Sequence, residues 1–378
     1  MKKKIKILHL TKGTELYGAQ RVILNLAENI NSENFEALIA TLVNNRHGQG
    51  TFVEEIENRG EKAITIKCRK RIDIPALQAL ITILKNQHID ILHCHELKSR
   101  LYGLIAARAR NIPVVTTHHN WTGANRLVKI FECLDALYIR FFDRIIAVSE
   151  ELKLSMLKFK IPAKRITVIL NGINLKEFQG DQKDITSLRK KIGIKVGEKI
   201  IGNVGRLSVE KGHKLFLTTA ELIKKEYPAI QFVIVGNGPL EGELKILVDK
   251  LGLKENVFFT GFCQDVQQIY SIMDIYLSTS VVEGTPMAMM EAMAMGVPVV
   301  ATKVGGVSGL LQQNQGGILL DNNEPEKIAD SVIDLLKNPD KLARLAANAQ
   351  KNIEENHSAL QMVRQYENIY MNIIKKTG

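Results

Sequence analysis

The chain has 378 residues, of which 45% are hydrophobic and 24% charged, as in globular proteins of about two domains. Its net charge of +11 lies in the first half, because residues 1–175 hold 27 Lys and Arg against 16 Asp and Glu, whereas residues 176–378 hold 24 against 24. No stretch approaches the roughly 18 uninterrupted apolar residues of a membrane span, and the first apolar run is too short for a signal peptide.

The four cysteines, Cys68, Cys94, Cys133 and Cys263, show no CxxC spacing. The absence of such pairs argues against a zinc ribbon or a disulfide framework. We therefore expect a cytoplasmic protein with reduced thiols.

Short apolar runs alternate with longer stretches of helical period throughout the first half. The runs predict strands at residues 5–10, 36–43, 90–94, 114–118 and 144–149, and the helical stretches lie at 19–30, 74–86 and 98–109. This alternation is typical of βαβ units around a parallel sheet.

The same pattern returns in the second half. It predicts strands at residues 199–205, 230–238, 256–261, 274–280 and 298–302, and two helices at 341–376. The polar, strand-poor segment 176–198 is the candidate linker. We predict two doubly wound α/β domains that bind ligands at the carboxyl ends of their strands.

The ten residues that begin at Pro286 read PMAMMEAMAM, so that Glu291 is the one polar residue in an apolar helix. Thr285 suits the N-cap and Gly296 the position after the helix. A charge in such a helix costs several kcal/mol unless it is paired or hydrogen-bonded. Glu291 is therefore predicted to have a partner, whereas the methionines are core residues. Glu283 lies eight residues earlier, before a loop that opens the helix and could cradle an anion.

The motif GRLSVEKG follows the first predicted strand of the second half. It places Arg206 and Lys211 at the carboxyl end of that strand, where two cations suit a diphosphate. By itself the motif also fits a surface loop with solvated charges.

GRLSVEKG and EGTPMAMME together resemble the donor-diphosphate and E-x7-E motifs of the GT-B retaining glycosyltransferases of family 4, and the resemblance covers nearly the whole chain. It implies that Glu291 binds the ribose hydroxyls of a nucleotide and that Glu283 lies at the transferred sugar. The loop after Glu283 would give backbone N–H groups to sugar and phosphate, except at proline, which has none. These loop residues are Gly284, Thr285, Pro286 and Met287.

Three segments of the first half extend the resemblance. TELYGAQRV is similar to the family's glycine-rich loop, with Gly18 retained and Tyr17 in place of an earlier glycine. PVVTTHHN resembles the T-x-H segment and implies that His119 contacts the donor sugar. VILNGIN resembles the NGID element, with Asn174 where the family has aspartate.

The histidines also allow a different interpretation. His93, His95, His118 and His119 lie at the ends of two predicted strands and could bind zinc. The residues that directly follow His119 are expected on the acceptor side, namely Asn120, Trp121 and Thr122. The choice of donor is expected to depend on backbone contacts around Phe262 and Cys263, which follow the strand at 256–261.

The resemblance implies a GT-B fold, with two Rossmann-like domains facing each other across a cleft. We place the acceptor domain at 1–175, the donor domain at 176–355, and a helix that crosses back to the first domain at 356–378. The implied reaction is metal-independent and retaining, needs no cofactor, and uses a nucleoside diphosphate sugar, UDP-sugar being favoured over GDP-sugar. Arg206 and Lys211 would stabilise the departing diphosphate.

Other functions fit the same motifs. A nucleotide-sugar epimerase or a glucan synthase has the same architecture, and a non-catalytic sensor would keep the donor site. Nucleic-acid binding is disfavoured, because the basic half has no aromatic-basic recognition motif.

The acceptor is expected to be a lipid-linked or saccharide component of the cell envelope. The stretches 67–85 and 153–165 combine cations with apolar residues, as in proteins that bind the anionic inner face of the plasma membrane. Alternatively, both helices pack on the sheet and their cations are solvated.

Overall fold

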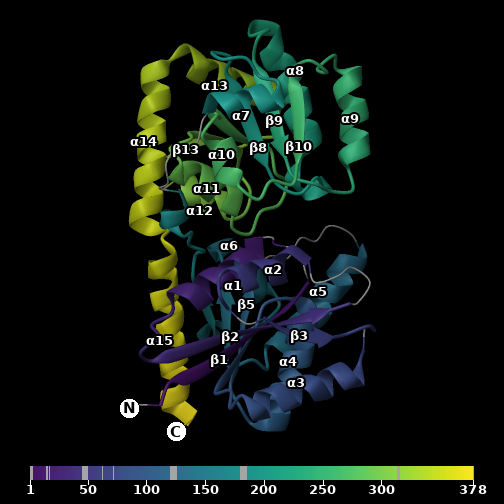
Figure 1. Ribbon diagram of the computed structural model, residues 1–378, viewed down its shortest axis with the longest axis vertical. Helices are drawn as coiled ribbons and strands as arrows, with labels where there is room; N and C mark the ends of the chain where they lie inside the picture. The colour runs from purple at the N-terminus through teal and green to yellow at the C-terminus, as the bar shows by residue number, and fades with distance from the viewer. Residues whose placement is uncertain are drawn as a thin grey trace. The chain divides into compact units, whose positions relative to one another are not determined.

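The computed structural model describes residues 3–13, 16, 18–44, 50–61, 63–70, 72–119, 126–178, 185–312 and 316–377. The chain forms two compact units (Figure 1). Unit 1 comprises Met1–Gly172 and Ala359–Gly378, and unit 2 comprises Ile173–Ser358.

In its described part, unit 1 has a parallel sheet of seven strands in the order β3-β2-β1-β4-β5-β6-β7. The chain order reverses between β1 and β4, which pair with Ile7 opposite Ile91. The strands are β1 (Ile5–Lys12), β2 (Phe35–Val43), β3 (Ala63–Lys67), β4 (Ile91–Cys94), β5 (Val114–His118), β6 (Arg144–Ala147) and β7 (Ile166–Val168).

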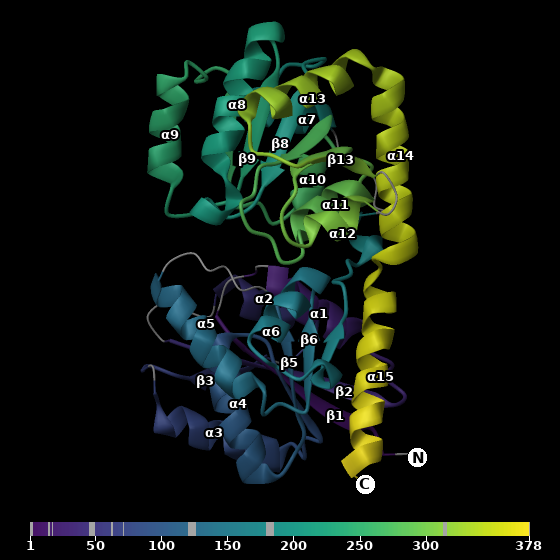
Figure 2. The same ribbon diagram turned by 180° about the vertical axis from the view of Figure 1, so that it is seen from behind.

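Helices cover both faces of this sheet. On one face Leu8 and Leu10 of β1 share a core with α3, α4, α5 and α6, whereas on the other face Ile39 of β2 packs with α1 and α2. The C-terminal helix α15 lies beside α1 (Figure 2). The helices are α1 (Gly18–Asn29), α2 (Gly50–Asn58), α3 (Ile74–Asn86), α4 (Leu97–Arg110), α5 (Arg126–Ile139), α6 (Glu150–Lys158), η1 (Ala163–Arg165) and α15 (Ala359–Thr377).

Unit 2 has, among its described residues, a parallel sheet of six strands in the order β10-β9-β8-β11-β12-β13. The strands are β8 (Ile200–Val204), β9 (Gln231–Val235), β10 (Val257–Gly261), β11 (Ile275–Ser278), β12 (Val299–Thr302) and β13 (Gly317–Leu320). The helices are η2 (Leu175–Phe178), α7 (Ile185–Ile192), η3 (Val209–Lys211), α8 (His213–Glu226), α9 (Glu241–Lys250), α10 (Val266–Tyr270), α11 (Met287–Ala294), α12 (Val307–Gln312), α13 (Pro325–Lys337) and α14 (Pro339–Asn356).

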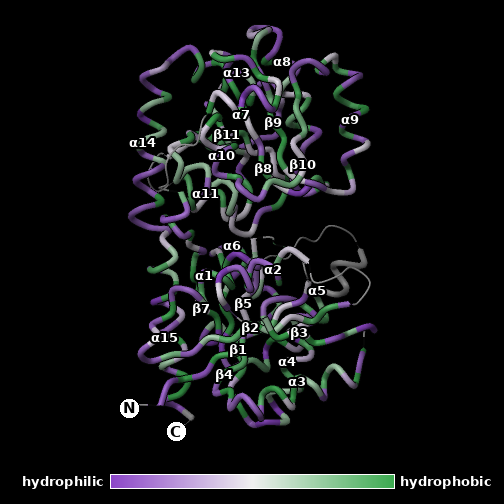
Figure 3. The backbone as a smooth tube through the Cα atoms, viewed as in Figure 1, coloured by the Kyte–Doolittle hydropathy of each residue, from purple (hydrophilic) through white to green (hydrophobic). Residues whose placement is uncertain are grey.

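The sequence explains why both sheets are parallel. Central strands such as β9, with the sequence QFVIV, are buried along their whole length, and such continuous burial is typical of sheets covered on both faces. Figure 3 shows much of the central strands in the green of hydrophobic residues. The predicted α/β class with two Rossmann-like domains is confirmed.

Two local predictions were wrong. Part of the expected linker 176–198 forms η2 and α7 within unit 2, and the chain passes between the units at residues 172–173 and 358–359. The apolar helix begins at Met287 with Pro286 as its N-cap, so Thr285 does not take that position. Proline in this place leaves the helix without a side-chain cap, because its ring has no hydrogen-bonding group.

Candidate functional site

The loops of the two donor motifs lie at the carboxyl ends of two central strands of the unit 2 sheet. Strands β8 and β11 are neighbours at the point where the chain order of the sheet reverses. Arg206 follows β8 and Glu283 follows β11. Parallel α/β sheets bind ligands at such a reversal, beyond the carboxyl ends of the strands.

An ion pair joins the two loops. Lys211 Nζ lies 2.6 Å from Glu283 Oε1, and the two side chains are 25% and 9% exposed. Ser280 donates a hydrogen bond of 2.7 Å to the same carboxylate oxygen. Arg206 is exposed in the loop after β8. The two predicted cations therefore differ in their surroundings, because Lys211 binds a carboxylate whereas Arg206 faces solvent.

Glycines fix the backbone around Glu283. A Cβ added at Gly305 would overlap the carbonyl oxygen of Glu283, and one at Gly306 would overlap that of Gly284. Gly306 N also donates to the carbonyl of Glu283 at 3.3 Å. The turn after β12 therefore presses directly against the Glu283 loop, and only glycine permits this approach.

Glu291 is buried in α11 with 4% of its surface exposed. Tyr270 donates a hydrogen bond of 2.9 Å to Glu291 Oε2, so the predicted partner is a phenol from α10. Burial, followed by the negative charges of Glu283 and Glu291, raises the pKa of Tyr276 well above its usual value. Both carboxylates thus act electrostatically on one tyrosine of β11.

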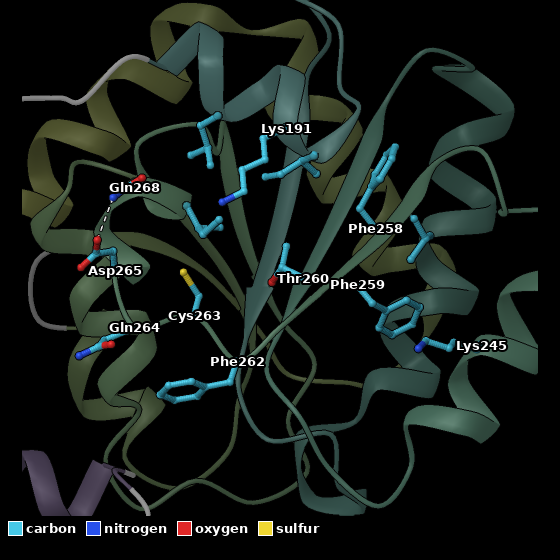
Figure 4. A pocket seen from close by; sticks show the side chains of 14 residues that line it. Lys191, Lys245, Phe258, Phe259, Thr260, Phe262, Cys263, Gln264, Asp265 and Gln268 are labelled. Atoms are coloured by element: carbon cyan, nitrogen blue, oxygen red, sulfur yellow. Dashed lines mark hydrogen bonds between the residues drawn. The ribbon is translucent and has the colours of Figure 1, made fainter. Parts of the chain in front are cut away.

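A pocket of about 820 Å³ lies along the edge strand β10 (Figure 4). Phe262 and Cys263, which follow β10, line it together with Lys191 of α7 and Gln268 of α10. The residues that line this pocket do not include Arg206, Lys211, Glu283 or Glu291. Among the predicted donor residues, the structure therefore brings only Phe262 and Cys263 into this pocket.

The site residues predicted in the first half belong to unit 1. Gly18 is the first residue of α1, where free backbone N–H groups can bind an anion. His119 follows β5, and its Nε2 lies 3.4 Å from His95 Nδ1. Four residues of the prediction lie outside the described residues, namely Tyr17, Asn120, Trp121 and Thr122.

His119 is partly exposed and contacts a group of buried histidines. His9 Nδ1 lies 3.1 Å from His95 Nε2, and His93 stacks on His95 with ring centroids 4.3 Å apart. Burial lowers the pKa of His9 and of His119 to about 3, and burial followed by neighbouring histidines holds the pKa values of His93 and His95 well below normal. The rings are therefore neutral at physiological pH.

The zinc interpretation requires a different set of histidines from the predicted one. Ring nitrogens of His9, His93 and His95 lie within 4.8 Å of one another, but both nitrogens of His93 already bond, to the Tyr370 hydroxyl at 2.7 Å and to Thr117 Oγ1 at 2.8 Å. A metal would have to displace one of these bonds. The geometry therefore favours a hydrogen-bonded histidine network.

His118 belongs to another polar cluster, which the sequence did not reveal. Its Nε2 lies 2.7 Å from Asp135 Oδ2, and Arg100 holds Asp135 through two bonds of 2.9 and 2.7 Å. Burial would raise the pKa of Asp135, but Arg100 and His118 outweigh it and hold the pKa below normal. This cluster fixes α4 and α5 against the end of β5.

Comparisons with known proteins identify the family of the chain. The family model described as Glycosyltransferase Family 4 matches residues 17–177, and the model described as Glycosyl transferases group 1 matches residues 184–352. The chain belongs to these GT-B glycosyltransferases and is an enzyme that transfers a sugar.

The sequence identities to individual relatives are low. The chain is 26% identical over 98% of both chains to the UDP-Gal:alpha-D-GlcNAc-diphosphoundecaprenol alpha-1,3-galactosyltransferase of Escherichia coli. It is 27% identical over 80% of both chains to the N-acetyl-alpha-D-glucosaminyl L-malate synthase of Bacillus anthracis. The crystal structure of Anabaena Alr3699/HepE in complex with UDP and glucose matches 97% of this chain and 100% of that chain, with a TM-score of 0.86 and 22% identity.

The glycine contact at the Glu283 loop predicts a specific loss of activity. In Gly306→Ala the new methyl group must push the backbone at Gly284 aside, and a displacement of about 1 Å at a reacting centre costs about 100-fold in rate. Steady-state kinetics of sugar transfer should show this loss in kcat/KM. Gly309→Ala is the matched control, because a Cβ there meets nothing within 4 Å. Full activity in Gly306→Ala, or an equal loss in Gly309→Ala, would contradict this positioning role.

The histidine network predicts that the protein loses stability in mild acid. The pKa of His9 falls from 6.5 to about 3 on folding, so the unfolded chain binds the proton first, and stability is lost as pH falls below 6.5. For each such histidine the loss is about 1 kcal/mol between pH 6.5 and 5.5, and it approaches about 1.4 kcal/mol for each further pH unit. Denaturant unfolding across this range should show a weaker pH dependence in His9→Phe.

His88→Asn, at an exposed histidine, is the control for this experiment. It should keep the pH dependence of the wild type. An unchanged pH dependence in His9→Phe would show that His9 is not neutral in the folded state.

Proposed function

We propose that the chain is a retaining, metal-independent glycosyltransferase that takes a hexose-type sugar from a nucleoside diphosphate donor, with UDP-sugar favoured over GDP-sugar. The acceptor is a lipid-linked or saccharide precursor of a cell-envelope glycan. The protein acts in the cytoplasm, in peripheral contact with the inner face of the plasma membrane. Two names support the donor and the acceptor, since the E. coli relative is named for UDP-Gal and a diphosphoundecaprenol acceptor, and the Anabaena structure contains UDP and glucose.

The Lys211–Glu283 pair carries this proposal. It lies at the switch point of the unit 2 sheet, the place between β8 and β11 where the chain order of the strands reverses. A diphosphate needs cationic partners, and a sugar offers hydroxyl donors to a carboxylate. A nucleotide sugar bound across the pair would supply a new partner to each member. The diphosphate would take Lys211 and Arg206, and the sugar hydroxyls would take Glu283.

The remaining roles follow from the family resemblance. Glu291 holds the ribose hydroxyls, and Tyr270 keeps its carboxylate in place. Backbone groups of the loop after Glu283 contact sugar and phosphate, and residues after β10 contact the base. These sets are Gly284, Thr285, Pro286 and Met287, and Phe262 and Cys263. From unit 1 we assign Gly18 to phosphate, His119 to the donor sugar, and Asn120, Trp121 and Thr122 to the acceptor.

The chemistry requires one bond to break and one to form on the same face of the sugar. The bond between the anomeric carbon and the diphosphate oxygen breaks, and the acceptor oxygen bonds to that carbon. The acceptor proton passes to the departing phosphate oxygen, so the mechanism needs no general base. Lys211 and Arg206 stabilise the charge that develops on the diphosphate, which is the largest requirement of this step. Glu283 is bound to Lys211 and Ser280 and orients the sugar.

The neutral histidine network fits a positioning role for His119. Because the pKa of His119 is lowered to about 3 by burial, its imidazole exchanges hydrogen bonds with a sugar hydroxyl without changing charge near neutral pH. His95 lies behind it at 3.4 Å. The ring is thus oriented from within unit 1.

One reaction tests the proposal. UDP- and GDP-sugars are offered with a polyprenyl-diphosphate sugar as acceptor, with and without excess EDTA, and the product is examined by NMR. We expect a faster reaction with UDP-sugar, an unchanged rate in EDTA, and an anomeric coupling constant that shows the configuration of the donor. Lys211→Met should lose at least tenfold in kcat/KM, since a charged hydrogen bond contributes about 1.5–3 kcal/mol.

Each part of the proposal has its own contradicting result. An inverted linkage would exclude the retaining mechanism and demand a general base. Loss of activity in EDTA, restored by a divalent metal, would exclude metal independence. Isomerisation of the donor sugar without transfer would identify an epimerase instead.

A further inference from the structure

Three histidines form a line from the interior of unit 1 to the residue assigned to the donor sugar. His9 Nδ1 lies 3.1 Å from His95 Nε2, and His95 Nδ1 lies 3.4 Å from His119 Nε2. His9 and His95 are buried, whereas His119 is partly exposed. We call these three rings the imidazole chain. It starts within β1 and passes through the residues that follow β4 and β5.

The rings of the imidazole chain point their nitrogens at one another. The ring centroids of His9 and His95 are 5.4 Å apart, and those of His95 and His119 are 5.7 Å apart. In each pair this separation exceeds the distance between the facing nitrogens, 3.1 and 3.4 Å, by the same 2.3 Å. That difference matches the radii of two imidazole rings, so the facing nitrogens lie close to the line between the ring centres, as an N–H···N hydrogen bond requires.

A fourth histidine holds the chain in place without joining it. His93 stacks on His95 with ring centroids 4.3 Å apart. Both nitrogens of His93 bond elsewhere, to the Tyr370 hydroxyl of α15 at 2.7 Å and to Thr117 Oγ1 of β5 at 2.8 Å. The stack therefore fixes the plane of the His95 ring, and with it the directions in which the two His95 nitrogens point.

Each ring of the chain carries one N–H at neutral pH. Burial lowers the pKa of His9 and of His119 to about 3 and, together with the neighbouring charges, holds the pKa of His95 well below normal. A neutral imidazole donates from one nitrogen and accepts at the other. Both hydrogen bonds of the chain can therefore form in only two ways, with all three protons on Nδ1 or all three on Nε2. A mixed pattern would set two N–H groups, or two lone pairs, against each other.

The inner end of the chain selects between these two patterns. His9 Nε2 is buried and has no hydrogen-bond partner among the described residues. With the protons on Nε2, this atom would be a buried N–H without an acceptor, which folded proteins avoid more strictly than an unused lone pair. With the protons on Nδ1, it carries only a lone pair. The Nδ1–H pattern is therefore the more stable one.

We infer that His95, backed by His9, holds His119 as its Nδ1–H tautomer, so that the second nitrogen of His119 is a hydrogen-bond donor and not an acceptor. This nitrogen has no bond to a described residue. The inference rests on the proposed function for the identity of its ligand, the donor sugar. A donor at this place favours a sugar that offers an oxygen lone pair and disfavours a protonated amino sugar, which offers only N–H groups.

NMR spectroscopy of the full chain with ¹⁵N-labelled histidine tests the tautomer without donor or acceptor. Protonated and unprotonated ring nitrogens differ widely in ¹⁵N chemical shift, and single variants assign the signals. We expect the Nδ1–H form for His9, His95 and His119. The exposed His88 is the control, because imidazole in water slightly prefers the Nε2–H form. An Nε2–H signal for His119 in the wild type would overturn the inference.

Two variants of His95 separate this positioning role from simple packing. In His95→Phe a ring remains but no N–H faces His119 Nε2, so His119 should return towards the Nε2–H form. The kcat/KM for the UDP-sugar should fall about fivefold, as for one neutral hydrogen bond, with UDP affinity unchanged. His95→Asn places an amide N–H where Nδ1 was and should restore both the tautomer and most of the rate. Equal losses in both variants with an unchanged His119 tautomer would assign His95 to packing alone.

The outcomes keep this inference and the proposed function apart. The Nδ1–H form of His119 in a chain that transfers no sugar would support the inference and overturn the proposed function. Sugar transfer by a chain with the Nε2–H form of His119 would do the reverse. If His95→Phe does not fold, the wild-type spectrum still decides the tautomer.

Discussion

The ion pair between Lys211 and Glu283 fixes the site at the switch point of the unit 2 sheet. Glu283 is only 9% exposed, and removing the partner of such a carboxylate costs about 3–5 kcal/mol. Any ligand that binds Lys211 must therefore also satisfy Glu283. A nucleotide sugar carries both an anionic diphosphate and hydroxyl donors, so the pair itself selects this class of ligand.

The rest of the site is built to hold these two side chains still. Ser280 hydrogen-bonds the Glu283 carboxylate, and the turn at Gly305 and Gly306 closes on its backbone. Tyr270 does the same for Glu291 on the neighbouring helix. Such preorganised polar groups stabilise developing charge without reorganisation during the reaction. In unit 1 the buried histidines and the Arg100–Asp135 pair give the same rigidity to the end of β5.

Much of this architecture could be predicted from the sequence, because local patterns determine it. Continuous apolar runs predicted the parallel strands, and the isolation of Glu291 predicted a buried partner. The pairing of Lys211 with Glu283 was not predictable, since it depends on β8 lying beside β11 in the sheet. The expected linker was wrong because α7 lies beside the edge strand β10 within unit 2 although none of its residues is buried, so its composition resembles that of a linker. His9 was missed because it joins His95 only through the pairing of β1 with β4.

Calorimetric titration of UDP and of a UDP-sugar into the wild type, Lys211→Met and Glu283→Gln tests the central claim most directly. If the ion pair is the donor site, Lys211→Met weakens both ligands by about tenfold or more, as expected for a lost charged hydrogen bond. Glu283→Gln should keep or raise the affinity for UDP, because it releases Lys211 for the diphosphate, and should weaken the binding of the UDP-sugar relative to that of UDP. Wild-type affinity for both ligands in both variants would contradict the account.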